Sequence, residues 1–373
     1  MLKVITVVGT RPEIIRLSET IKLLDSVCDH ILVHTGQNYD YELNQIFFDD
    51  LDIREPDYFL NAAEDNLAAT LANIFRSLDE ILEKINPDAF LVLGDTNSAL
   101  SAILAKRRKV PVFHVEAGNR CFDYNVPEEI NRKIVDNVAD INITYSQLAR
   151  ENLIREGFQA QQVICLGSPM KEVITKNQLK IEQSSIISKL GIEKKNYFLF
   201  SLHREENVDE KTRVDKAVEI IRYIASEYNL PTILSLHPRT RKRLPTDTFI
   251  GLENLIIHPP FCFSDYLSLQ ANAKIVFSDS GTITEECSIM NFPAINLRDT
   301  HERPEGMEVG AAMFTGLELE SIKNAVALLL HVNQRNQIPA MVEDYDVNDF
   351  SLRLVKAILS YSQYVNTYIW HKG

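Results

Sequence analysis

Short runs of apolar, often β-branched residues alternate along the first half of this chain with longer segments whose apolar residues recur at helical spacing. The short runs, which predict strands, lie at residues 3–8, 30–35, 89–93, 110–115, 141–145 and 162–166. The longer segments, which predict helices, lie at residues 12–26, 41–50, 65–85, 97–107, 128–138 and 147–157. Strands that alternate with helices are typical of a parallel sheet that carries helices on both faces. The first half therefore predicts a doubly wound α/β domain.

A polar segment at residues 175–196 interrupts this rhythm, and a second series of apolar runs follows it. The second series lies at residues 197–202, 232–236, 254–258, 274–278 and 294–297, again with helices between the runs. We therefore expect an N-terminal domain at 1–175 and a C-terminal domain at 176–346. Apolar residues at helical spacing predict one more helix within 347–373, which we expect to pack back onto the first domain. The predicted fold class is α/β, with two Rossmann-like doubly wound domains that face a cleft.

The composition supports two domains and narrows the possible partners. The chain has 373 residues, which is more than one hydrophobic core usually serves. Its formal net charge of -13 argues against binding to nucleic acid or to an anionic membrane, because both require basic surfaces. The five cysteines are scattered and form no CxxC pair, which predicts free thiols in a reducing compartment. No apolar run approaches the ~18 residues of a membrane span, and the first run is too short for a signal peptide, so we expect a cytoplasmic protein.

Carboxylates of the first half follow two predicted strands at the point where each strand ends. Ligands bind at the carboxyl ends of the strands in open parallel sheets. Asp95 follows the run at 89–93, Glu116 follows the run at 110–115, and Glu128 opens a helix shortly afterwards. If the two strands are neighbours, ~4.8 Å apart, Asp95 and Glu116 share a pocket and can act as an acid and a base. The alternatives are that Asp95 only caps the helix that it precedes, and that the charged residues after Glu116 form a solvated loop.

The segment Gly9–Glu13 follows the first predicted strand and opens a helix. Glycine permits a tight turn, proline suits the first helical turn, and helix N-termini attract anions. Arg11 and, one helical turn later, Arg16 add a guanidinium clamp for phosphate. The chain contains neither a GxG sequence nor a P-loop, so the usual dinucleotide and nucleotide fingerprints are absent. The alternative is an ordinary strand-to-helix turn with exposed arginines.

Three segments of the second half carry side chains that suit a nucleotide. His203 ends the strand predicted at 197–202, where it can contact a phosphate or a leaving group, although a lone histidine is as often a satisfied polar group. The backbone N–H groups of Ser280 and Gly281 can cradle a phosphate, and Glu286 can accept hydrogen bonds from a ribose diol. Arg303 lies among carboxylates after another strand. We predict no metal site, because the sequence contains no HExxH motif or cysteine–histidine cluster.

Taken together, these segments resemble the non-hydrolysing UDP-N-acetylglucosamine 2-epimerase family. The matching pieces occur in the family's order and span nearly the whole chain. They are GTRPE at 9–13, GDTNS at 94–98, HVEAGNR at 114–120, PEEINR at 127–132, HREEN at 203–207, SDSGTITEE at 278–286 and RDTHERPE at 298–305. The resemblance implies two Rossmann-like domains of the glycosyltransferase-B type, a homodimer, a UDP-sugar substrate and no cofactor.

The resemblance also implies roles for individual residues. Catalytic roles fall to Asp95, Glu116, Glu128 and His203. Substrate binding falls to Arg11, Arg16, Ser280, Gly281, Glu286 and Arg303, and we add Arg120 of the HVEAGNR motif. Phe261 and Tyr266 fall where family members contact the nucleotide end of the substrate. Because the family epimerises carbon 2 by eliminating UDP and adding it back, the resemblance implies an isomerase that needs no nicotinamide.

Two departures from the usual family sequence favour one branch of it. After Glu-Ala-Gly the usual epimerases read Leu-Arg-Thr, whereas this chain reads Asn119, Arg120 and Cys121. The family's Thr-Gly-Gln-His ends here in Asn38. Both match better the UDP-2-acetamido-2,6-dideoxy-L-talose 2-epimerases, whose product, UDP-N-acetyl-L-fucosamine, serves capsule or O-antigen synthesis. The alternatives are a UDP-N-acetylglucosamine/UDP-N-acetylmannosamine 2-epimerase, a glycosyltransferase of the same fold, a hydrolysing epimerase and a nucleotide-sugar sensor without catalysis.

Overall fold

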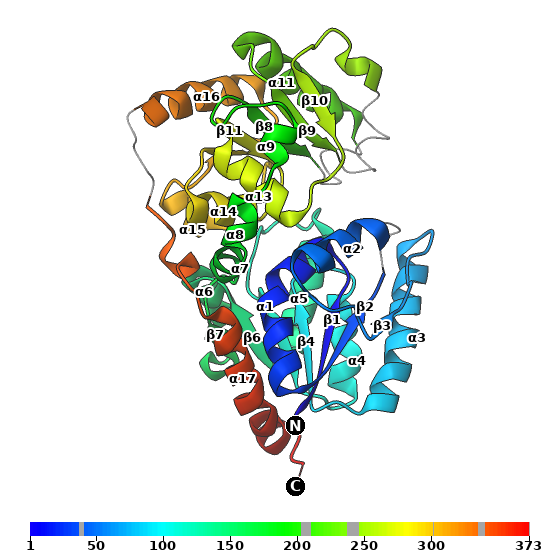
Figure 1. Ribbon diagram of the computed structural model, residues 1–373. Coiled ribbons are helices and arrows are strands. Elements are labelled where there is room, and N and C mark those ends of the chain that lie inside the picture. The colour runs from blue at the N-terminus through cyan, green and yellow to red at the C-terminus, as the bar shows by residue number, and fades with distance from the viewer. Residues whose placement is uncertain (37–40, 203–209, 237–245, 301, 335–339, 373) are drawn as a thin grey trace. The chain divides into compact units, whose positions relative to one another are not determined.

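The computed structural model describes residues 1–36, 41–202, 210–236, 246–300, 302–334 and 340–372. The chain forms two units, one made of Met1–Lys176 and Asp344–Gly373, the other of Asn177–Glu343. Each unit contains a parallel β-sheet with helices packed on its faces (Figure 1). The predicted α/β class with two parallel-sheet domains is therefore confirmed. His203 and Asn38 lie outside the described residues.

The sheet of the first unit has seven strands among the described residues, in the order β3-β2-β1-β4-β5-β6-β7, and all neighbouring pairs are parallel. They are β1 (Lys3–Val8), β2 (Asp29–His34), β3 (Tyr58–Phe59), β4 (Ala89–Leu93), β5 (Val112–Val115), β6 (Ile141–Thr144) and β7 (Val163–Cys165). β1 pairs with β4 although β2 and β3 lie between them in the chain, so the strand order reverses there. Ligands of open α/β sheets bind at such a reversal, beyond the carboxyl ends of the strands.

Helices connect these strands, and one further helix returns to the first unit from the far end of the chain. They are α1 (Arg11–Val27), α2 (Tyr41–Asp50), α3 (Leu67–Ile85), α4 (Ala102–Arg107), α5 (Pro127–Val138), α6 (Gln147–Arg155), α7 (Met170–Lys176) and α17 (Phe350–Tyr364). α17 lies beside α1 (Figure 1). The backbone N–H and the hydroxyl of Ser351 donate to the two oxygens of Glu172 at 2.7 and 2.6 Å, and these hydrogen bonds fasten the start of α17 to α7.

The sheet of the second unit has six parallel strands among the described residues, in the order β10-β9-β8-β11-β12-β13. They are β8 (Phe198–Leu202), β9 (Thr232–Leu236), β10 (Leu255–His258), β11 (Ile275–Ser278), β12 (Ala294–Asn296) and β13 (Met313–Phe314). The helices are α8 (Gln178–Glu182), α9 (Ile186–Lys189), α11 (Lys211–Tyr228), α13 (Phe263–Asn272), α14 (Ile283–Met290), α15 (Pro304–Glu308) and α16 (Leu319–Gln334). The strand order reverses between β8 and β11, so a ligand site is expected at their carboxyl ends.

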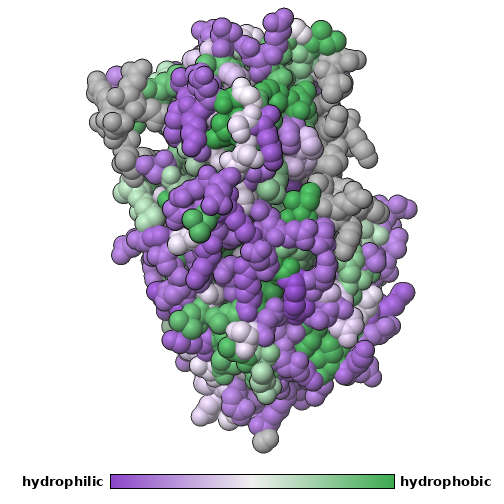
Figure 2. Space-filling model, in the orientation of Figure 1, coloured by the Kyte–Doolittle hydropathy of each residue, from purple (hydrophilic) through white to green (hydrophobic). Residues whose placement is uncertain are grey.

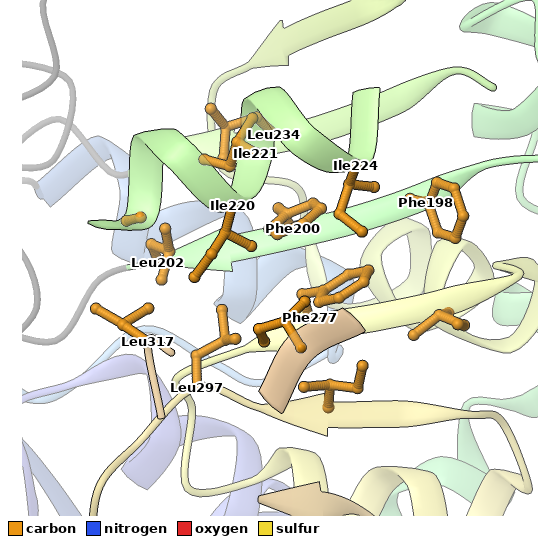
Figure 3. Packing of buried hydrophobic residues seen from close by; sticks show 14 of the residues in the cluster. Phe198, Phe200, Leu202, Ile220, Ile221, Ile224, Leu234, Phe277, Leu297 and Leu317 are labelled. Atoms are coloured by element: carbon orange, nitrogen blue, oxygen red, sulfur yellow. The ribbon is translucent and has the colours of Figure 1, made fainter. Parts of the chain in front are cut away.

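Aromatic and branched side chains fill the space between sheet and helices. In the second unit, Phe200 of β8 and Phe277 of β11 are fully buried, and their rings stack with centroids 4.2 Å apart (Figure 3). Ile220 and Ile224 of α11 belong to the same buried cluster (Figure 3). Truncating one such phenylalanine to alanine typically costs about 3–5 kcal/mol of stability. The core of this unit therefore holds β8 and β11 in place, and their ends carry the predicted nucleotide residues.

The surface differs from this interior. The face visible in Figure 2 is mostly hydrophilic, and its hydrophobic residues lie in small separate areas. Among the described residues, no helix has the length and apolar character needed to cross a membrane.

Candidate active site

The carboxyl ends of β4 and β5 bring Asp95 and Glu116 to one edge of the first sheet. The two strands are neighbours, and Leu93 at the end of β4 pairs with Val115 at the end of β5. Gly94, between Leu93 and Asp95, has a φ of +70°, and a methyl group built on it would lie 3.8 Å from the Glu116 carboxylate. Glycine therefore suits the turn, because this backbone conformation strains other residues. Asp95 and Glu116 follow adjacent strands, as the strand pattern predicts.

Two buried arginines hold these carboxylates. Arg16 of α1 forms a hydrogen-bonded ion pair with Glu116, and Arg132 of α5 forms one with Asp95. The side chains of both arginines are almost fully buried, whereas the Asp95 side chain is 19% exposed. A neighbouring guanidinium favours the ionised form of a carboxylate. Arg16 thus holds Glu116 in this structure. The contact of Arg16 with phosphate stays a prediction.

The backbone of Glu116 is unusual for a residue other than glycine. Its φ is +67°, in the left-handed region. Such a conformation costs roughly 1–3 kcal/mol in a residue with a side chain, and it persists only where the surrounding contacts hold it. The amide of Asn119 donates to the Glu116 carboxylate at 3.4 Å, which adds a second contact besides that of Arg16. The strained backbone and these contacts together support a functional role for Glu116.

Glu13 of α1 is buried between the turns that follow β1 and β4. One carboxylate oxygen accepts hydrogen bonds from the N–H of Gly9 at 2.8 Å, from the N–H of Thr10 at 2.6 Å and from the Thr10 hydroxyl at 2.8 Å. The other oxygen accepts a hydrogen bond from the Thr96 hydroxyl at 2.7 Å. Burial raises the pKa of Glu13 to about 7, although the four hydrogen bonds act in the opposite direction. A single buried carboxyl group therefore connects the two turns.

Arg11 stands at the start of α1, next to the carboxyl end of β1. It is half-buried, and its guanidinium carbon lies 5.7 Å from the centroid of the Phe47 ring of α2. A cation–π contact of this kind is worth about 0.5–1 kcal/mol. The contact orients Arg11 at the end of the helix where anions bind, and its predicted contact with phosphate stays a prediction.

The start of α5 is fastened to the turn that carries Asp95. Glu128, the third predicted carboxylate, is half-buried in the first turn of this helix. Glu129 is fully buried and lies 3.4 Å from the guanidinium of Arg132. The side-chain amide of Asn131 donates to the backbone carbonyl of Asp95 at 2.9 Å. The helix start that carries Glu128 is therefore held in register with Asp95.

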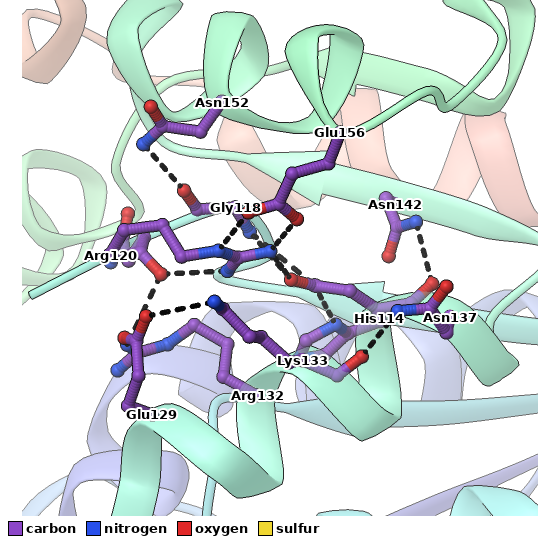
Figure 4. A network of polar contacts seen from close by, with 12 residues as sticks. His114, Gly118, Arg120, Glu129, Arg132, Lys133, Asn137, Asn142, Asn152 and Glu156 are labelled. Carbon is purple, nitrogen blue, oxygen red and sulfur yellow. Dashed lines mark hydrogen bonds and ion pairs between the residues drawn. The ribbon is translucent and has the colours of Figure 1, made fainter. Parts of the chain in front are cut away.

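The guanidinium of Arg120 lies in a buried network of charges (Figure 4). It donates to the two oxygens of Glu156 at 2.8 and 2.6 Å and lies 2.8 Å from Asp136. Asp136 also lies 2.9 Å from a ring nitrogen of His114. Burial alone would raise the pKa of Asp136, but the hydrogen bonds and charges of His114 and Arg120 lower it overall. Arg120 thus fixes the loop after β5, and its predicted contact with substrate stays a prediction.

The turn between β11 and α14 carries Ser280 and Gly281 at the carboxyl end of the second sheet. The N–H of Ser280 donates to the hydroxyl of Ser278 at 3.1 Å. The Ser280 hydroxyl lies 2.8 Å from the Thr282 hydroxyl and accepts a hydrogen bond from the Thr282 N–H at 3.2 Å. Ser280 therefore shapes the turn in this structure. The phosphate contacts expected of Ser280 and Gly281 stay predictions.

Tyr266 of α13 and Glu286 of α14 lie close together at the same end of this sheet. The Tyr266 hydroxyl forms hydrogen bonds with the side chains of Ser201 and Ser278, and the charge of Glu286 acts on it. Burial, together with that negative charge, raises the pKa of Tyr266, so the phenol is neutral at physiological pH. The side-chain amide of Gln270 donates to Glu286 at 2.7 Å. The structure thus brings two of the predicted nucleotide residues together, and Gln270 is hydrogen-bonded to one of them, Glu286.

Phe261 and Arg303 are both buried in the second unit. The ring of Phe261 stacks on that of His258 with centroids 4.0 Å apart. The Nε of Arg303 donates to Glu285 at 2.9 Å, which ties Arg303 to the helix that also carries Glu286. The nucleotide contacts of Phe261 and Arg303 stay predictions. The role of His203 also stays a prediction, because this residue lies outside the described residues.

The sequence analysis assigns no site role to Glu13, Arg132 or Gln270, although Glu13 and Arg132 lie in the motifs GTRPE and PEEINR. Thr10 and Glu13 have the spacing of a capping box, so the sequence explains Glu13 as part of a helix start. Nothing in that motif predicts the hydrogen bond between Glu13 and Thr96. Arg132 lies at helical spacing from Glu128, so the face of α5 was a usable signal. Gln270 lies four residues after Tyr266 on α13 and so has the same signal, although its hydrogen-bond partner, Glu286, lies on another helix.

No group of three or more His, Cys, Asp or Glu side chains in the described part of the chain is arranged to hold a metal ion. The best-placed carboxylates, Asp95 and Glu116, are each paired with an arginine instead.

Comparisons with known proteins point to one family of enzymes. The sequence profile of the family described as UDP-N-acetylglucosamine 2-epimerase matches residues 23–359. A structure of UDP-N-acetylglucosamine 2-epimerase from Rickettsia bellii is 48% identical to this chain, with a TM-score of 0.92 and 100% of both chains covered. The structure of Methanocaldococcus jannaschii UDP-GlcNAc 2-epimerase in complex with UDP-GlcNAc and UDP is 35% identical, with a TM-score of 0.89, and covers 96% of this chain and 100% of that chain. The UDP-2,3-diacetamido-2,3-dideoxy-D-glucuronate 2-epimerase of Pseudomonas aeruginosa is 32% identical over 86% of this chain and 90% of its own length.

Proposed function

This chain belongs to the UDP-N-acetylglucosamine 2-epimerase family and is a UDP-sugar 2-epimerase, an isomerase, and we propose that it converts UDP-2-acetamido-2,6-dideoxy-L-talose to UDP-N-acetyl-L-fucosamine. One observation carries the chemistry of this proposal. Asp95 and Glu116 follow adjacent strands, and each is paired with a buried arginine from a different helix. This arrangement supplies two charged carboxylates at the edge of the sheet where a sugar is expected to bind.

The paired carboxylates suit an elimination followed by an addition. The hydrogen at carbon 2 of an acetamido sugar is weakly acidic, because no carbonyl group is attached to that carbon. We propose that one carboxylate, Asp95 or Glu116, removes this proton while the bond between carbon 1 and the UDP oxygen breaks. The electron pair of that bond leaves with UDP, and a double bond forms between carbons 1 and 2. UDP then adds back to carbon 1 as a proton reaches carbon 2 from the opposite face.

Inversion at carbon 2 needs a proton-transfer group on each face of the sugar ring. Asp95, Glu116 and Glu128 are the candidates, and Glu128 lies at the start of the helix that is hydrogen-bonded to the Asp95 turn. General acid–base catalysis by such groups typically contributes about 10²- to 10⁴-fold. Glu116 and Asp95 are each held by an arginine at the end of a strand, which places both for the role of base.

We propose that the first unit handles the sugar and that the second unit binds UDP. Tyr266 and Glu286 lie together at the carboxyl end of the second sheet, where Glu286 can accept hydrogen bonds from ribose. The turn of Ser280 and Gly281 is proposed to bind the pyrophosphate. Phe261 and Arg303, which the family resemblance assigns to the nucleotide end and to substrate binding, are proposed as further contacts. Arg11 and His203 are proposed to stabilise the negative charge on the departing UDP.

The loop after Glu116 supports the 6-deoxy-L-sugar as substrate. Asn119 stands where the usual epimerases carry leucine, and its amide donates to Glu116. Phe122 of the same loop is 71% exposed, and we propose that its ring contacts the sugar at carbon 6, where a methyl group suits an apolar surface better than a hydroxymethyl group. The relative from P. aeruginosa, which is named for another UDP-sugar, supports differences of substrate within the family.

The second candidate is epimerisation of UDP-N-acetylglucosamine. The names of the proteins from R. bellii and M. jannaschii favour it. Incubating the purified chain with each UDP-sugar in heavy water, followed by NMR, distinguishes the two. We expect epimerisation of the 6-deoxy-L-talo sugar with deuterium at carbon 2. Turnover of UDP-N-acetylglucosamine alone would refute the proposed branch, and a product without deuterium at carbon 2 would refute the elimination.

The same incubation distinguishes epimerisation from three further activities. Steady release of free UDP would indicate a hydrolysing epimerase, and turnover only with an added acceptor would indicate a glycosyltransferase. Binding without any turnover would indicate a sensor.

We further propose a homodimer that acts in the cytoplasm and supplies a precursor for capsule or O-antigen. None of the five cysteines forms a disulfide within the described part of the chain, which suits a reducing compartment. Light scattering on the purified chain tests the homodimer, since the expected mass is twice the 42.6 kDa of one chain. Cell fractionation tests the location.

A further inference from the structure

The hydrogen bond between Glu13 and Thr96 joins the ends of two strands of the first sheet. β1 and β4 are neighbours, with Val4 paired with Ala89; the turn after β1 leads into Arg11, the first residue of α1, and the turn after β4 carries Asp95. Glu13 is 1% exposed, so its carboxyl group has exchanged water for protein partners. Thr96 is the residue directly after Asp95, and its hydroxyl lies 2.7 Å from Glu13. The contact therefore acts on the backbone next to a predicted catalytic carboxylate.

A capping box explains only half of this arrangement. In such a box, the glutamate accepts a hydrogen bond from the N-cap residue of its own helix. One oxygen of Glu13 does so with Thr10 and also binds the N–H of Gly9. The second oxygen is not needed for the helix start and is used by Thr96, which belongs to another turn. The hydrogen bond between Glu13 and Thr96 therefore needs an explanation other than helix capping.

The Asp95 turn is held from two sides. From α5, Arg132 pairs with the Asp95 side chain and Asn131 donates to the Asp95 carbonyl. From α1, Glu13 accepts the hydrogen bond of Thr96. Proton transfer to a carboxylate depends steeply on its position, and a displacement of about 1 Å can lower a rate by about 100-fold.

We propose that Glu13 is a positioning residue for the epimerisation. Through its hydrogen bond with Thr96, it holds the Asp95 turn at a fixed place relative to the turn that precedes Arg11. This inference rests on the proposed function of Asp95. It assigns no contact with substrate to Glu13. We call the hydrogen bond between Glu13 and Thr96 the bridge. Because the bridge acts on the chemical step, its loss changes kcat more than KM or the affinity for UDP.

Thr96→Val tests the bridge without altering Glu13 or the start of α1. Valine has nearly the shape of threonine but lacks the hydroxyl. We expect kcat to fall by about 10-fold or more, with the Kd for UDP unchanged, because UDP is proposed to bind the second unit. Thr96→Ser keeps the hydroxyl, and we expect it to restore most of the lost kcat.

Ser351→Ala is the matched control. The Ser351 hydroxyl also donates to a buried carboxylate, that of Glu172, at 2.6 Å, but this contact joins α7 to α17. We expect Thr96→Val and Ser351→Ala to lower the melting temperature by similar amounts, with kcat reduced only in Thr96→Val. The inference is overturned if kcat falls equally in both variants, or if Thr96→Ser is as slow as Thr96→Val.

Wild-type turnover separates a failure of this inference from a failure of the proposed function. If the wild-type chain epimerises no UDP-sugar, the proposed function fails. In that case, the effect of the bridge on the two turns is measured by comparing backbone amide NMR shifts between the wild type and Thr96→Val. We expect shifts at Gly9 and Thr10 as well as at Asp95. Shifts confined to residues 94–97 would overturn the inference, because the two turns would then be independent.

Discussion

Glu116 combines a left-handed backbone, a nearly buried carboxylate and contacts with Arg16 and Asn119. Asp95, on the neighbouring strand end, is more exposed and is held by Arg132 and Asn131. The two carboxylates thus have different surroundings, although both are paired with an arginine. Different surroundings are what allow two carboxyl groups to take different parts in proton transfer.

We expect Glu116→Gln and Asp95→Asn each to lower kcat by about 10²- to 10⁴-fold, because each removes a proton-transfer group. The Kd for UDP should stay unchanged, since the proposed UDP residues lie in the other unit. Steady-state kinetics and isothermal titration calorimetry measure the two effects. Unaltered turnover in either variant would exclude a catalytic role for that residue, provided that thermal unfolding shows the variant to be folded.

The buried Glu13 makes a pH-dependent contribution to stability. Its pKa is about 7 in the folded chain, against 4.5 for an ordinary glutamate, so the folded state binds the proton more tightly. The contribution is therefore fully present below pH 4.5 and is lost as the pH rises towards 7. The gap between the two values corresponds to roughly 3 kcal/mol.

Glu13→Gln isolates this effect. The glutamine oxygen can accept the hydrogen bonds of Gly9 and Thr10, and its amide can donate to Thr96, so the bridge is kept without a titratable group. We expect the wild type to lose roughly 3 kcal/mol relative to the variant between pH 4.5 and 7. Urea unfolding at several pH values measures the difference. A difference that is constant with pH would contradict the assignment.

At the scale of elements, the charge network of Arg120 joins three parts of the first unit. Arg120 comes from the loop after β5 and Glu156 from the end of α6 (Figure 4). Their common partner, Asp136, belongs to α5. Removing one partner of a buried ion pair leaves an uncompensated charge, which typically costs about 3–5 kcal/mol. By tying the loop after β5 to α5 and α6, the network therefore helps to fix the position of the loop that follows Glu116.

We expect Arg120→Met to lower the free energy of unfolding by about 3–5 kcal/mol at neutral pH, because Asp136 is then charged and buried without its guanidinium. Arg155→Met is the control, since Arg155 forms an exposed pair with Glu151 on α6. Such surface pairs are worth about 0.2–1 kcal/mol. Equal losses in the two variants, measured by urea unfolding, would show that the Arg120 network is no more important than a surface pair.

The hydrophobic pattern predicts the main strands of both sheets and the class of fold, because buried parallel strands are apolar runs. It does not show β3 or β13, which are only two residues long. It also predicts a connection at 175–196, where the structure has the end of α7 and the short helices α8 and α9. These helices are too short and polar to show a clear helical period.

The same limit applies to the site. The adjacency of Asp95 and Glu116 could be predicted, because strand ends in a parallel sheet lie at one edge. Their arginine partners could not, because Arg16 and Glu116 are far apart in the sequence and any of several arginines had the required charge. Only the packing of α1 and α5 on the sheet selects Arg16 and Arg132.

At the scale of the whole molecule, α17 joins the end of the chain to its beginning. Leu354 is fully buried on the side of α17 that packs into the first unit, whereas Leu352 of the same helix is 44% exposed. We expect Leu354→Ala to lower the free energy of unfolding by about 2–5 kcal/mol, with kcat unchanged at a temperature where the variant is folded. Leu352→Ala should change stability by less than about 0.5 kcal/mol. Chemical unfolding and kinetics check both, and equal effects of the two variants would mean that α17 is not docked as described.

The return of the chain to the first unit sets an order for folding during synthesis. The chain leaves the first unit at Lys176 and comes back at Asp344. All of the second unit therefore emerges from the ribosome while the first unit still lacks α17. At about 5–20 residues per second, this delay is on the order of ten seconds or more, and for that time the apolar side of α1 has no partner from the end of the chain. We therefore expect the nascent first unit to expose this apolar surface until α17 has been synthesised.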